Sequence, residues 1–316
     1  MRIKISDRNN PKGSCTVRLF DVAEFSPYDG PGTRTVVYFQ GCNAHCAWCH
    51  SPQSQPGHAP LLFNINVCAR CQRCVSACPY GVHSFSQGIH HIDRTRCIQC
   101  GACIEQCPNS IAGVRGSALH LPTAEVSVSS LFEQIDPYIR LNGKNGGITL
   151  SGGEALLQPE AAEELLRSCK QRGYHTAIET SGLLSLATYE RVLPLVDLWL
   201  FGMRIITHPH ALPHHHHIKE VLRLLIRNNA SVLPRIPMIP SYFDRDDVLQ
   251  SIASLLAEHS LTTVSLMPWN RNYAICYTES GIPLQMQPPS STEIELCESK
   301  ITSFFNNLTF KLYEHI

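Results

Sequence analysis

The 316-residue sequence has no excess of charge of either sign, because Lys and Arg total 26 and Asp and Glu also total 26. A neutral chain lacks the long-range field that draws a protein to nucleic acids or to anionic membranes. The sequence also lacks an uninterrupted apolar run of about 18 residues, the length that a membrane-spanning helix needs. Asp197 interrupts even the most apolar stretch, residues 192–203. We therefore expect no nucleic-acid partner and no membrane partner.

Residues 1–13 lack the apolar core of a secretory signal. We therefore expect a cytoplasmic chain, in which thiols stay reduced and disulfides are rare. Cysteine is nevertheless abundant: there are 15, and eleven of them lie between residues 42 and 107. In a reducing compartment this density favours metal clusters over disulfide bonds.

After residue 118 the sequence alternates between helical and strand patterns. Strand patterns separated by ten to twenty residues of helix predict a parallel sheet with crossover helices, as in an α/β barrel. Helices are expected at 124–141, 159–173, 185–194, 217–229, 244–259 and 290–306. Strands are expected at 33–41, 146–154, 174–182, 197–204, 231–240, 262–269 and 308–316.

Three polar or cysteine-bearing loops follow predicted strands: residues 42–49, the "SGGE" loop at 151–154 and the "ETSG" loop at 179–182. In an α/β barrel the active site is built from the loops at the carboxyl ends of the strands. The three loops are therefore expected to form one site.

Two cysteine runs with the same spacing follow the first loop. Residues 68–79 and 97–108 both read C-x2-C-x2-C-x3-C-P, the bacterial ferredoxin pattern for [4Fe-4S] clusters. In two-cluster ferredoxins the fourth cysteine of each run ligates the other cluster. One cluster would take Cys68, Cys71, Cys74 and Cys107, and the other would take Cys97, Cys100, Cys103 and Cys78.

A pair of structural zinc sites is the alternative, because zinc also binds four thiolates from C-x2-C pairs. Two copies of the same four-cysteine run, each closed by proline, favour iron-sulfur clusters. The residues between the runs suit a small hairpin.

The first loop, "GCNAHCAWCH" at 41–50, holds only three cysteines, Cys42, Cys46 and Cys49. Three thiolates can hold three corners of a cubane and leave one iron without a protein ligand. A metal position without a protein ligand can bind a substrate or cofactor, as it does in catalytic zinc sites.

The C-x3-C-x2-C spacing resembles the signature of radical S-adenosylmethionine enzymes. The approach "YDGPGTRTVVYFQGC" at 28–42 resembles the lead-in of the glycyl-radical-enzyme activating enzymes, and "SGGEALLQP" at 151–159 is similar to that family's glycine-rich loop. A two-cluster insert after the first loop is typical of the family's larger members. Together these motifs cover most of residues 20–270.

The resemblance implies a partial (β/α)6 TIM-like radical S-adenosylmethionine barrel with an inserted bacterial ferredoxin-like domain. The expected parts are residues 1–59 and 119–316 for the barrel and 60–118 for the insert. The implied cofactors are three [4Fe-4S] clusters and S-adenosylmethionine, which would chelate the open iron.

The resemblance also implies the activity. An electron would break the cofactor's sulfur to C5′ bond, and the 5′-deoxyadenosyl radical would take hydrogen from a glycine of a large glycyl radical enzyme. The donor would be flavodoxin or ferredoxin, and the chain would be a monomer. The implied cofactor contacts are Trp48, His50, Gly152, Gly153, Glu154, Glu179, Ser181, Met203, Arg204 and Asn270.

Several of these residues have plainer interpretations. "SGG" and "ETSG" also suit ordinary turns, and Trp48 could equally be a core residue. Gly202, Met203 and Arg204 stand where the family usually has Asp, an aliphatic residue and Lys. Gly202 supplies no carboxylate, whereas Arg204 can still bind the cofactor's carboxylate with a planar fork.

The stretch "MPWNRN" at 267–272 replaces a family segment that often carries His, which leaves Asn270 or Arg271 as the contact. Six histidines between His208 and His217 could bind a metal, but an exposed histidine-rich loop binds metal adventitiously as readily.

Two other functions stay open on the residues alone. One is an electron carrier that uses only the two-cluster insert, which would leave the three-cysteine loop unexplained. The other is a radical S-adenosylmethionine enzyme that acts on a small molecule or peptide with auxiliary clusters. Such enzymes place their extra cysteines late in the chain, where only Cys276 and Cys297 lie here.

Overall fold

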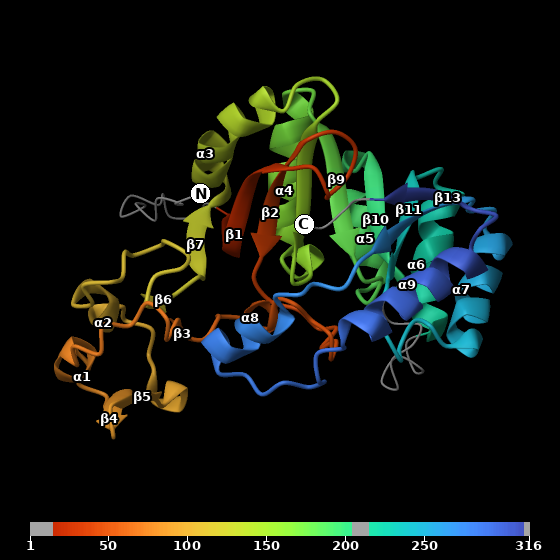
Figure 1. Cartoon of the computed structure of the whole chain (residues 1–316). Helices are drawn as coiled ribbons and strands as arrows, with labels where there is room; N and C mark the ends of the chain where they lie inside the picture. Colours follow the sequence, from red (N-terminus) through yellow and green to blue (C-terminus); the bar gives the residue numbers. More distant parts are fainter. Residues whose placement is uncertain (1–14, 204–214, 313–316) are drawn as a thin grey trace.

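The computed structural model describes residues 15–203 and 215–312. Its main feature is a nine-stranded sheet in the order β13-β12-β11-β10-β9-β8-β2-β1-β7. In Figure 1 the sheet runs from β7 on the left to β13 on the right. Its strands are β1 (Thr16–Ser26), β2 (Arg34–Phe39), β7 (Ala124–Ser127), β8 (Gly147–Gly152), β9 (His175–Thr180), β10 (Leu198–Gly202), β11 (Val232–Pro237), β12 (Thr263–Met267) and β13 (Thr309–Leu312).

Seven strands run parallel to one another: β2, β8, β9, β10, β11, β12 and β13. Strand β1 pairs antiparallel with β2 and with β7, which adds an antiparallel edge. This confirms the α/β class and all seven strands expected from the sequence. The predicted six-strand repeat corresponds to β2 and β8 through β12, and β13 adds a seventh parallel strand beside β12. Among the described residues no ladder joins β13 to β7, so the sheet is open.

Helices connect the parallel strands, as the alternating pattern predicts. Helix α4 buries Ala161, Leu165 and Cys169 on one face, as expected from their spacing. None of the described helices is long and apolar enough to cross a membrane. The connecting helices are α3 (Val128–Leu141), α4 (Pro159–Gln171), α5 (Leu186–Val192), α6 (His215–Arg227), α7 (Asp246–Glu258) and α9 (Ser291–Phe304).

The helix expected at 124–141 begins four residues later than predicted. Its first residues, "AEVS", form β7 and pair with β1. The side chain of Ser127 then accepts a hydrogen bond from the backbone N–H of Ser130, which caps the helix and fixes its start. A four-residue strand with apolar residues at alternate positions was hidden inside a helical pattern.

Residues between β3 (Leu62–Phe63) and β6 (Leu119–His120) form a separate small body, called the insert below, at lower left in Figure 1. The two strands pair antiparallel, so the chain enters and leaves the insert through one short ladder. Inside it, β4 (His83–Ser86) and β5 (Ile89–Ile92) form the hairpin predicted between the cysteine runs. Two short helices complete the insert: α1 (Arg73–Ala77) and α2 (Ala102–Glu105).

Helix α8 (Tyr273–Ser280), which the sequence patterns did not predict, joins the insert to the sheet. The guanidinium of Arg94 in the insert donates to the carbonyl oxygen of Glu279 at 2.8 Å and to that of Leu61 at 2.7 Å. At the other end of the helix, the Tyr273 hydroxyl donates to the carbonyl oxygen of Ala47 in the first cysteine loop. Helix α8 therefore contacts both cysteine-bearing parts of the chain.

Arg34, the arginine of the D-G-P-G-x-R-T lead-in, ties three neighbouring strands together. It is fully buried. Its Nε donates to Thr149 Oγ1 at 3.0 Å, and its other nitrogens contact the Ile148 carbonyl oxygen and His175 Nδ1. Burial and the nearby guanidinium lower the pKa of His175, so its Nδ1 is available to accept.

We predict that Arg34→Lys destabilises the protein by about 2 kcal/mol, because a lysine ammonium cannot reproduce the planar fork and leaves buried acceptors unsatisfied. Urea unfolding followed by circular dichroism under anaerobic conditions measures this change. The matched control is Arg167→Lys on the exposed face of α4, where Arg167 pairs with Glu163; there we expect a change within about 0.5 kcal/mol. Equal stability of the two variants would contradict the prediction.

Candidate functional site

The three-cysteine loop leaves the carboxyl end of β2 and is held by backbone hydrogen bonds to the segment that follows it. The N–H of Gly41 donates to the Ser54 carbonyl oxygen at 2.8 Å, and that of Cys42 donates to the Gln55 carbonyl oxygen at 3.0 Å. Cys46 is buried, whereas Cys42 and Cys49 are half-buried. Because both sides of the loop are fixed, its three thiols belong to one short, constrained segment.

The "SGGE" loop at the end of β8 lies directly against the start of this cysteine loop. The N–H of Gly153 donates to the Phe39 carbonyl oxygen, and that of Glu154 donates to the Gly41 carbonyl oxygen. A Cβ at Gly153 would lie 2.1 Å from the Gly41 oxygen and 3.1 Å from Cys42 Cβ. Gly152 has φ +111°, and a Cβ there would meet the Phe39 nitrogen at 2.3 Å. The two glycines therefore let neighbouring strand ends touch through their backbones.

Glu154 joins the "SGGE" loop to the "ETSG" loop after β9. Its carboxylate is buried and accepts from the Ser181 backbone N–H at 2.9 Å and from the Ser181 hydroxyl at 2.7 Å. The hydroxyl of Thr180 donates to the same carboxylate. Three of the residues expected at one site, Gly153, Glu154 and Ser181, are thus brought together with the first cysteine loop.

Trp48, within the cysteine loop, is buried against the segment that follows β11. Its ring packs edge-on against Tyr242 at 4.8 Å and Phe243 at 5.4 Å between centroids. The core interpretation of Trp48 therefore has direct geometric support, and an adenine contact stays a prediction. His50 is exposed at the end of the loop.

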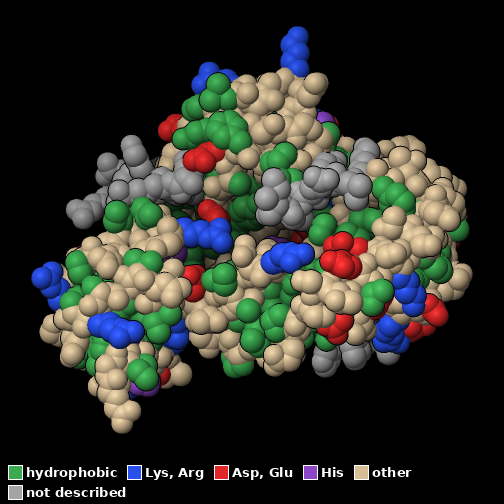
Figure 2. Space-filling model, in the orientation of Figure 1, with side chains coloured by type: hydrophobic (Ala, Val, Ile, Leu, Met, Phe, Trp, Pro, Cys, Tyr) green, Lys and Arg blue, Asp and Glu red, His purple; other side chains and the backbone are tan. Residues whose placement is uncertain are grey.

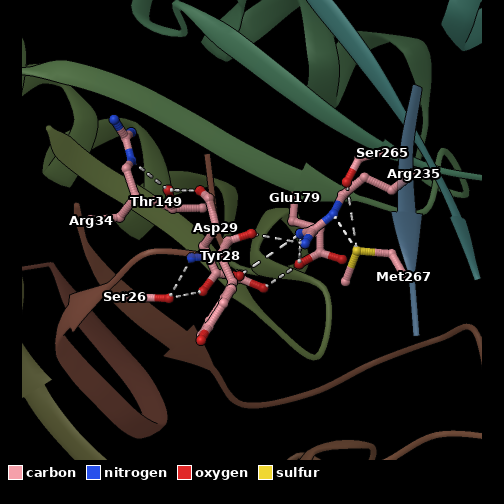
Figure 3. Close-up of polar contacts among 10 residues, drawn as sticks. Ser26, Tyr28, Asp29, Arg34, Thr149, Glu179, Arg235, Ser265 and Met267 are labelled. Carbon is pink, nitrogen blue, oxygen red and sulfur yellow. Dashed lines mark hydrogen bonds and ion pairs between the residues drawn. The ribbon is translucent and has the colours of Figure 1, made fainter. Parts of the chain in front are cut away.

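Glu179 lies in a buried polar network on one face of the sheet (Figure 3). Its Oε2 accepts from Ser151 Oγ at 2.8 Å and pairs with Arg235 at 3.2 Å. Arg235 also lies 3.8 Å from Asp29 Oδ1 and donates to the Tyr28 carbonyl oxygen. The network links the D-G-P-G lead-in to β9 and β11, so Glu179 has a structural role, and its contact with a cofactor stays a prediction.

The remaining expected contacts are less fully placed. Met203 follows β10 and is buried in the main core. Asn270 follows β12, and its Oδ1 accepts from the Asn272 backbone N–H at 2.8 Å next to the start of α8. Arg204 lies outside the described residues, as does the histidine-rich stretch up to 214.

The insert brings cysteines of the two runs near one another. Burial raises the pKa of the Cys74 thiol, and the nearby Cys68, Cys107 and Cys71 add to the rise. Burial likewise raises the pKa of the Cys103 thiol, with Cys97, Cys78 and Cys100 adding to the rise. A cavity in the insert is lined by all four cysteines of the second set. Each set therefore combines three cysteines of one run with the last cysteine of the other.

Burial keeps the central thiol of each set protonated in the absence of a metal. It raises the pKa of Cys74 to about 11 and that of Cys103 to about 12, with the neighbouring cysteines adding to both shifts. Metal binding requires thiolates, so a bound cluster must displace these protons. The clustering of three further sulfurs around each buried thiol fits a highly charged metal group that holds all four as thiolates.

The sequence patterns missed three features of this site. Arg235 is the one charged residue in the apolar strand β11, and that contrast was the available signal. Helix α8 is only weakly amphipathic, so its periodicity gave no signal for Tyr273. Cys276 had no spacing partner in the sequence; burial raises the pKa of its thiol, and the nearby Glu279 and Cys49 add to the rise.

Family models for iron-sulfur domains match two parts of the chain. A "4Fe-4S dicluster domain" matches residues 60–108, and a "4Fe-4S single cluster domain" matches residues 28–83. The first match contains both cysteine runs, which favours iron-sulfur clusters over zinc in the insert.

Curated relatives match nearly the whole chain. The sequence is 31% identical over 305 residues to the indoleacetate decarboxylase activating enzyme of Tractidigestivibacter scatoligenes, covering 90% of this chain and 94% of that protein. It is 33% identical over 307 residues to the choline trimethylamine-lyase activating enzyme of Oleidesulfovibrio alaskensis, covering 90% and 95%. It is 32% identical over 266 residues to the trans-4-hydroxy-L-proline dehydratase activating enzyme of Clostridioides difficile, covering 80% and 84%.

We predict that Gly153→Ala removes the iron held by the first cysteine loop and leaves the iron of the insert in place. The added Cβ would collide with the Gly41 backbone 2.1 Å away and displace Cys42. Iron and sulfide analysis after anaerobic reconstitution measures the loss. Gly57→Ala is the control, because its Cβ would meet only the Arg18 guanidinium at 3.6 Å. Full iron content in the Gly153→Ala protein would contradict the prediction.

Proposed function

The chain belongs to the family of glycyl-radical-enzyme activating enzymes, and on that premise we propose how its loops divide the work of forming a glycyl radical. Such an activating enzyme is an oxidoreductase that uses S-adenosylmethionine and iron-sulfur chemistry to generate a glycyl radical on a partner enzyme. The observation that carries the proposal is the backbone contact between the three-cysteine loop and the "SGGE" loop, because a metal bound by the three thiolates would lie next to polar groups suited to an amino acid.

Cys42, Cys46 and Cys49 would hold three irons of a [4Fe-4S] cluster. The S-adenosylmethionine amino and carboxylate groups would complete the coordination of the fourth iron. When both are bound, the reduced cluster would supply one electron for cleavage of the cofactor's sulfonium bond to C5′, and the cofactor would supply the means of removing a hydrogen atom from a glycine Cα of the partner. The protein binds, orients and shields these groups.

The cofactor cradle we propose comes from three neighbouring strand ends. Gly152 and Gly153 bring the "SGGE" backbone against the cysteine loop, and Glu154 would accept from the cofactor's ammonium group while fixing Ser181. Glu179 would act from β9 beside Arg235. The other contacts carried over from the resemblance are Trp48, His50, Met203, Arg204 and Asn270.

In the insert we propose two further [4Fe-4S] clusters, which brings the total to three. One would bind Cys68, Cys71, Cys74 and Cys107, and the other Cys97, Cys100, Cys103 and Cys78. The β3-β6 ladder supports a ferredoxin-like domain over residues 60–118, inserted into a radical S-adenosylmethionine barrel formed by residues 1–59 and 119–316.

The insert would relay single electrons from flavodoxin or ferredoxin to the first loop. Cys71 and Cys100 are both exposed, so each proposed cluster lies near the surface. Exposed arginines surround them, and Figure 2 shows basic side chains over the insert at lower left. Residues 60–118 contain five arginines and no lysine, against Asp93 and Glu105. This surface suits an acidic reductant.

We further propose a monomer that works in the cytoplasm, where its cysteines stay reduced. The partner is a large glycyl radical enzyme. Relatives of similar identity are named for different partner enzymes, so the similarity supports the activity and leaves the partner to be identified by experiment. The names of these relatives favour an activating enzyme over the electron carrier and over the small-molecule or peptide enzyme.

We predict that the reduced protein, mixed with S-adenosylmethionine and its partner enzyme, produces a glycyl radical doublet in electron paramagnetic resonance and releases 5′-deoxyadenosine. A panel of glycyl radical enzymes, including choline trimethylamine-lyase, a diol dehydratase and pyruvate formate-lyase, identifies the partner. The Cys46→Ala protein should give neither signal. A doublet from that variant would refute the role of the loop.

We predict that Cys71→Ala and Cys100→Ala leave the first-loop cluster assembled, because neither residue belongs to that loop. Glycyl radical formation with flavodoxin or ferredoxin as the donor should fall at least tenfold in each variant. A small chemical reductant such as dithionite should restore part of the rate, since it can reach the first cluster directly. Full activity with the protein donor would rule out the relay.

A further inference from the structure

His90, on β5 of the insert, contacts two sulfurs of one cysteine set. Its Nδ1 lies 3.9 Å from Cys68 Sγ and its Nε2 lies 3.7 Å from Cys74 Sγ, both within hydrogen-bond reach of sulfur. Both cysteines belong to the set that also contains Cys71 and Cys107. The imidazole is therefore next to the thiolates of one proposed cluster.

The ring of His90 is held in place on several sides. It stacks on Phe85 with centroids 4.4 Å apart and planes 10° apart, and it meets the edge of Phe63 at 4.7 Å. His83, from the other strand of the hairpin, places its Nδ1 3.0 Å from His90 Nε2. The residue His90 is only 8% exposed, so these contacts set the orientation of its ring.

The contact with His83 determines where the His90 proton lies. His83 Nε2 is buried and has no hydrogen-bond partner among the described residues. We assign the His83 proton to Nδ1, which then donates to His90 Nε2, because a buried N–H on Nε2 would have no acceptor among the described residues. His90 then carries its own proton on Nδ1, which faces Cys68 Sγ. A doubly protonated ring would present the same Nδ1–H, so the direction of this donation does not depend on charge.

The second cysteine set also has a histidine nearby, because His83 lines the same cavity as its four cysteines, but the contact differs. In the described part of the chain, no histidine nitrogen lies within hydrogen-bond distance of the sulfurs of Cys78, Cys97, Cys100 or Cys103. The two sets have the same ligand type and spacing, so the His90 contact is a chemical difference between them.

We propose that His90 is a positioning residue that donates an N–H···S hydrogen bond to the Cys68 thiolate and thereby raises the reduction potential of the cluster held by that set. An added electron increases the negative charge on the cluster sulfurs, so a donor stabilises the reduced cluster more than the oxidised one. The proposal rests on the cluster assignment made above. It gives two clusters with identical ligand sets different potentials.

The test is an anaerobic redox titration of the full-length protein, followed by electron paramagnetic resonance. Cys42→Ala, Cys46→Ala and Cys49→Ala are introduced together, so that only the insert clusters titrate. His90→Phe keeps the aromatic contact with Phe85 and removes the donor, whereas His90→Gln keeps an N–H donor. His91→Phe is the matched control, because His91 is the exposed neighbour on the same strand.

In His90→Phe we expect the equilibrium constant for reduction of one of the two clusters to fall about tenfold. For a one-electron couple this lowers the reduction potential by about 59 mV. The other cluster should not change. His90→Gln should shift the same cluster less, and His91→Phe should shift neither.

Unchanged potentials in His90→Phe, with iron content retained, would overturn the proposal. So would loss of one cluster's iron in both His90 variants but not in His91→Phe, since His90 would then be a ligand or a packing residue. If the background protein itself lacks two [4Fe-4S] signals, the cluster assignment fails, and the proposal fails with it for a separately recognisable reason.

Discussion

The site depends on the close approach of two backbones at the carboxyl ends of β2 and β8. These strands are neighbours in register, with Phe39 opposite Gly152, although more than a hundred residues separate them in the sequence. Because Gly153 has no side chain, the backbones that follow the two strands stay in contact, and the cysteine loop lies directly against the "SGGE" loop. The parallel sheet thus sets the position of the three thiols relative to the proposed cofactor contacts, and the intervening insert does not disturb it.

A second constraint is the network of buried charged residues beside these two loops. Glu154 and Glu179 come from adjacent strands, and each has several hydrogen-bond or ion-pair partners within the protein. Arg235 connects Glu179 to the loop that carries Asp29. Buried charges are tolerated only when they are compensated in this way, and removing one partner leaves a large desolvation penalty on the other. The arrangement gives the loops fixed positions before any cofactor binds.

Most of the sheet could be predicted from the sequence, because parallel strands buried on both faces give short apolar runs with clear boundaries. The cysteine sets followed from spacing alone. What the sequence did not reveal depends on tertiary contacts. The strand β7 was absorbed into a helical pattern, and α8 has too little periodicity to be recognised. The backbone contact at Gly153 could not be predicted, because the atom that an added Cβ would meet belongs to Gly41, a neighbour known only from the fold.

The β3-β6 ladder has a consequence for how such a chain can arise. Its paired residues, Leu62 with His120 and Phe63 with Leu119, bring the two ends of the insert together, so the chain leaves and rejoins the main body at one place almost sixty residues apart in the sequence. The free energy of closing a loop grows only slowly with its length. A lineage could therefore acquire or discard this whole module by recombination at one surface position, while the sheet and the loops at its carboxyl edge remain unchanged.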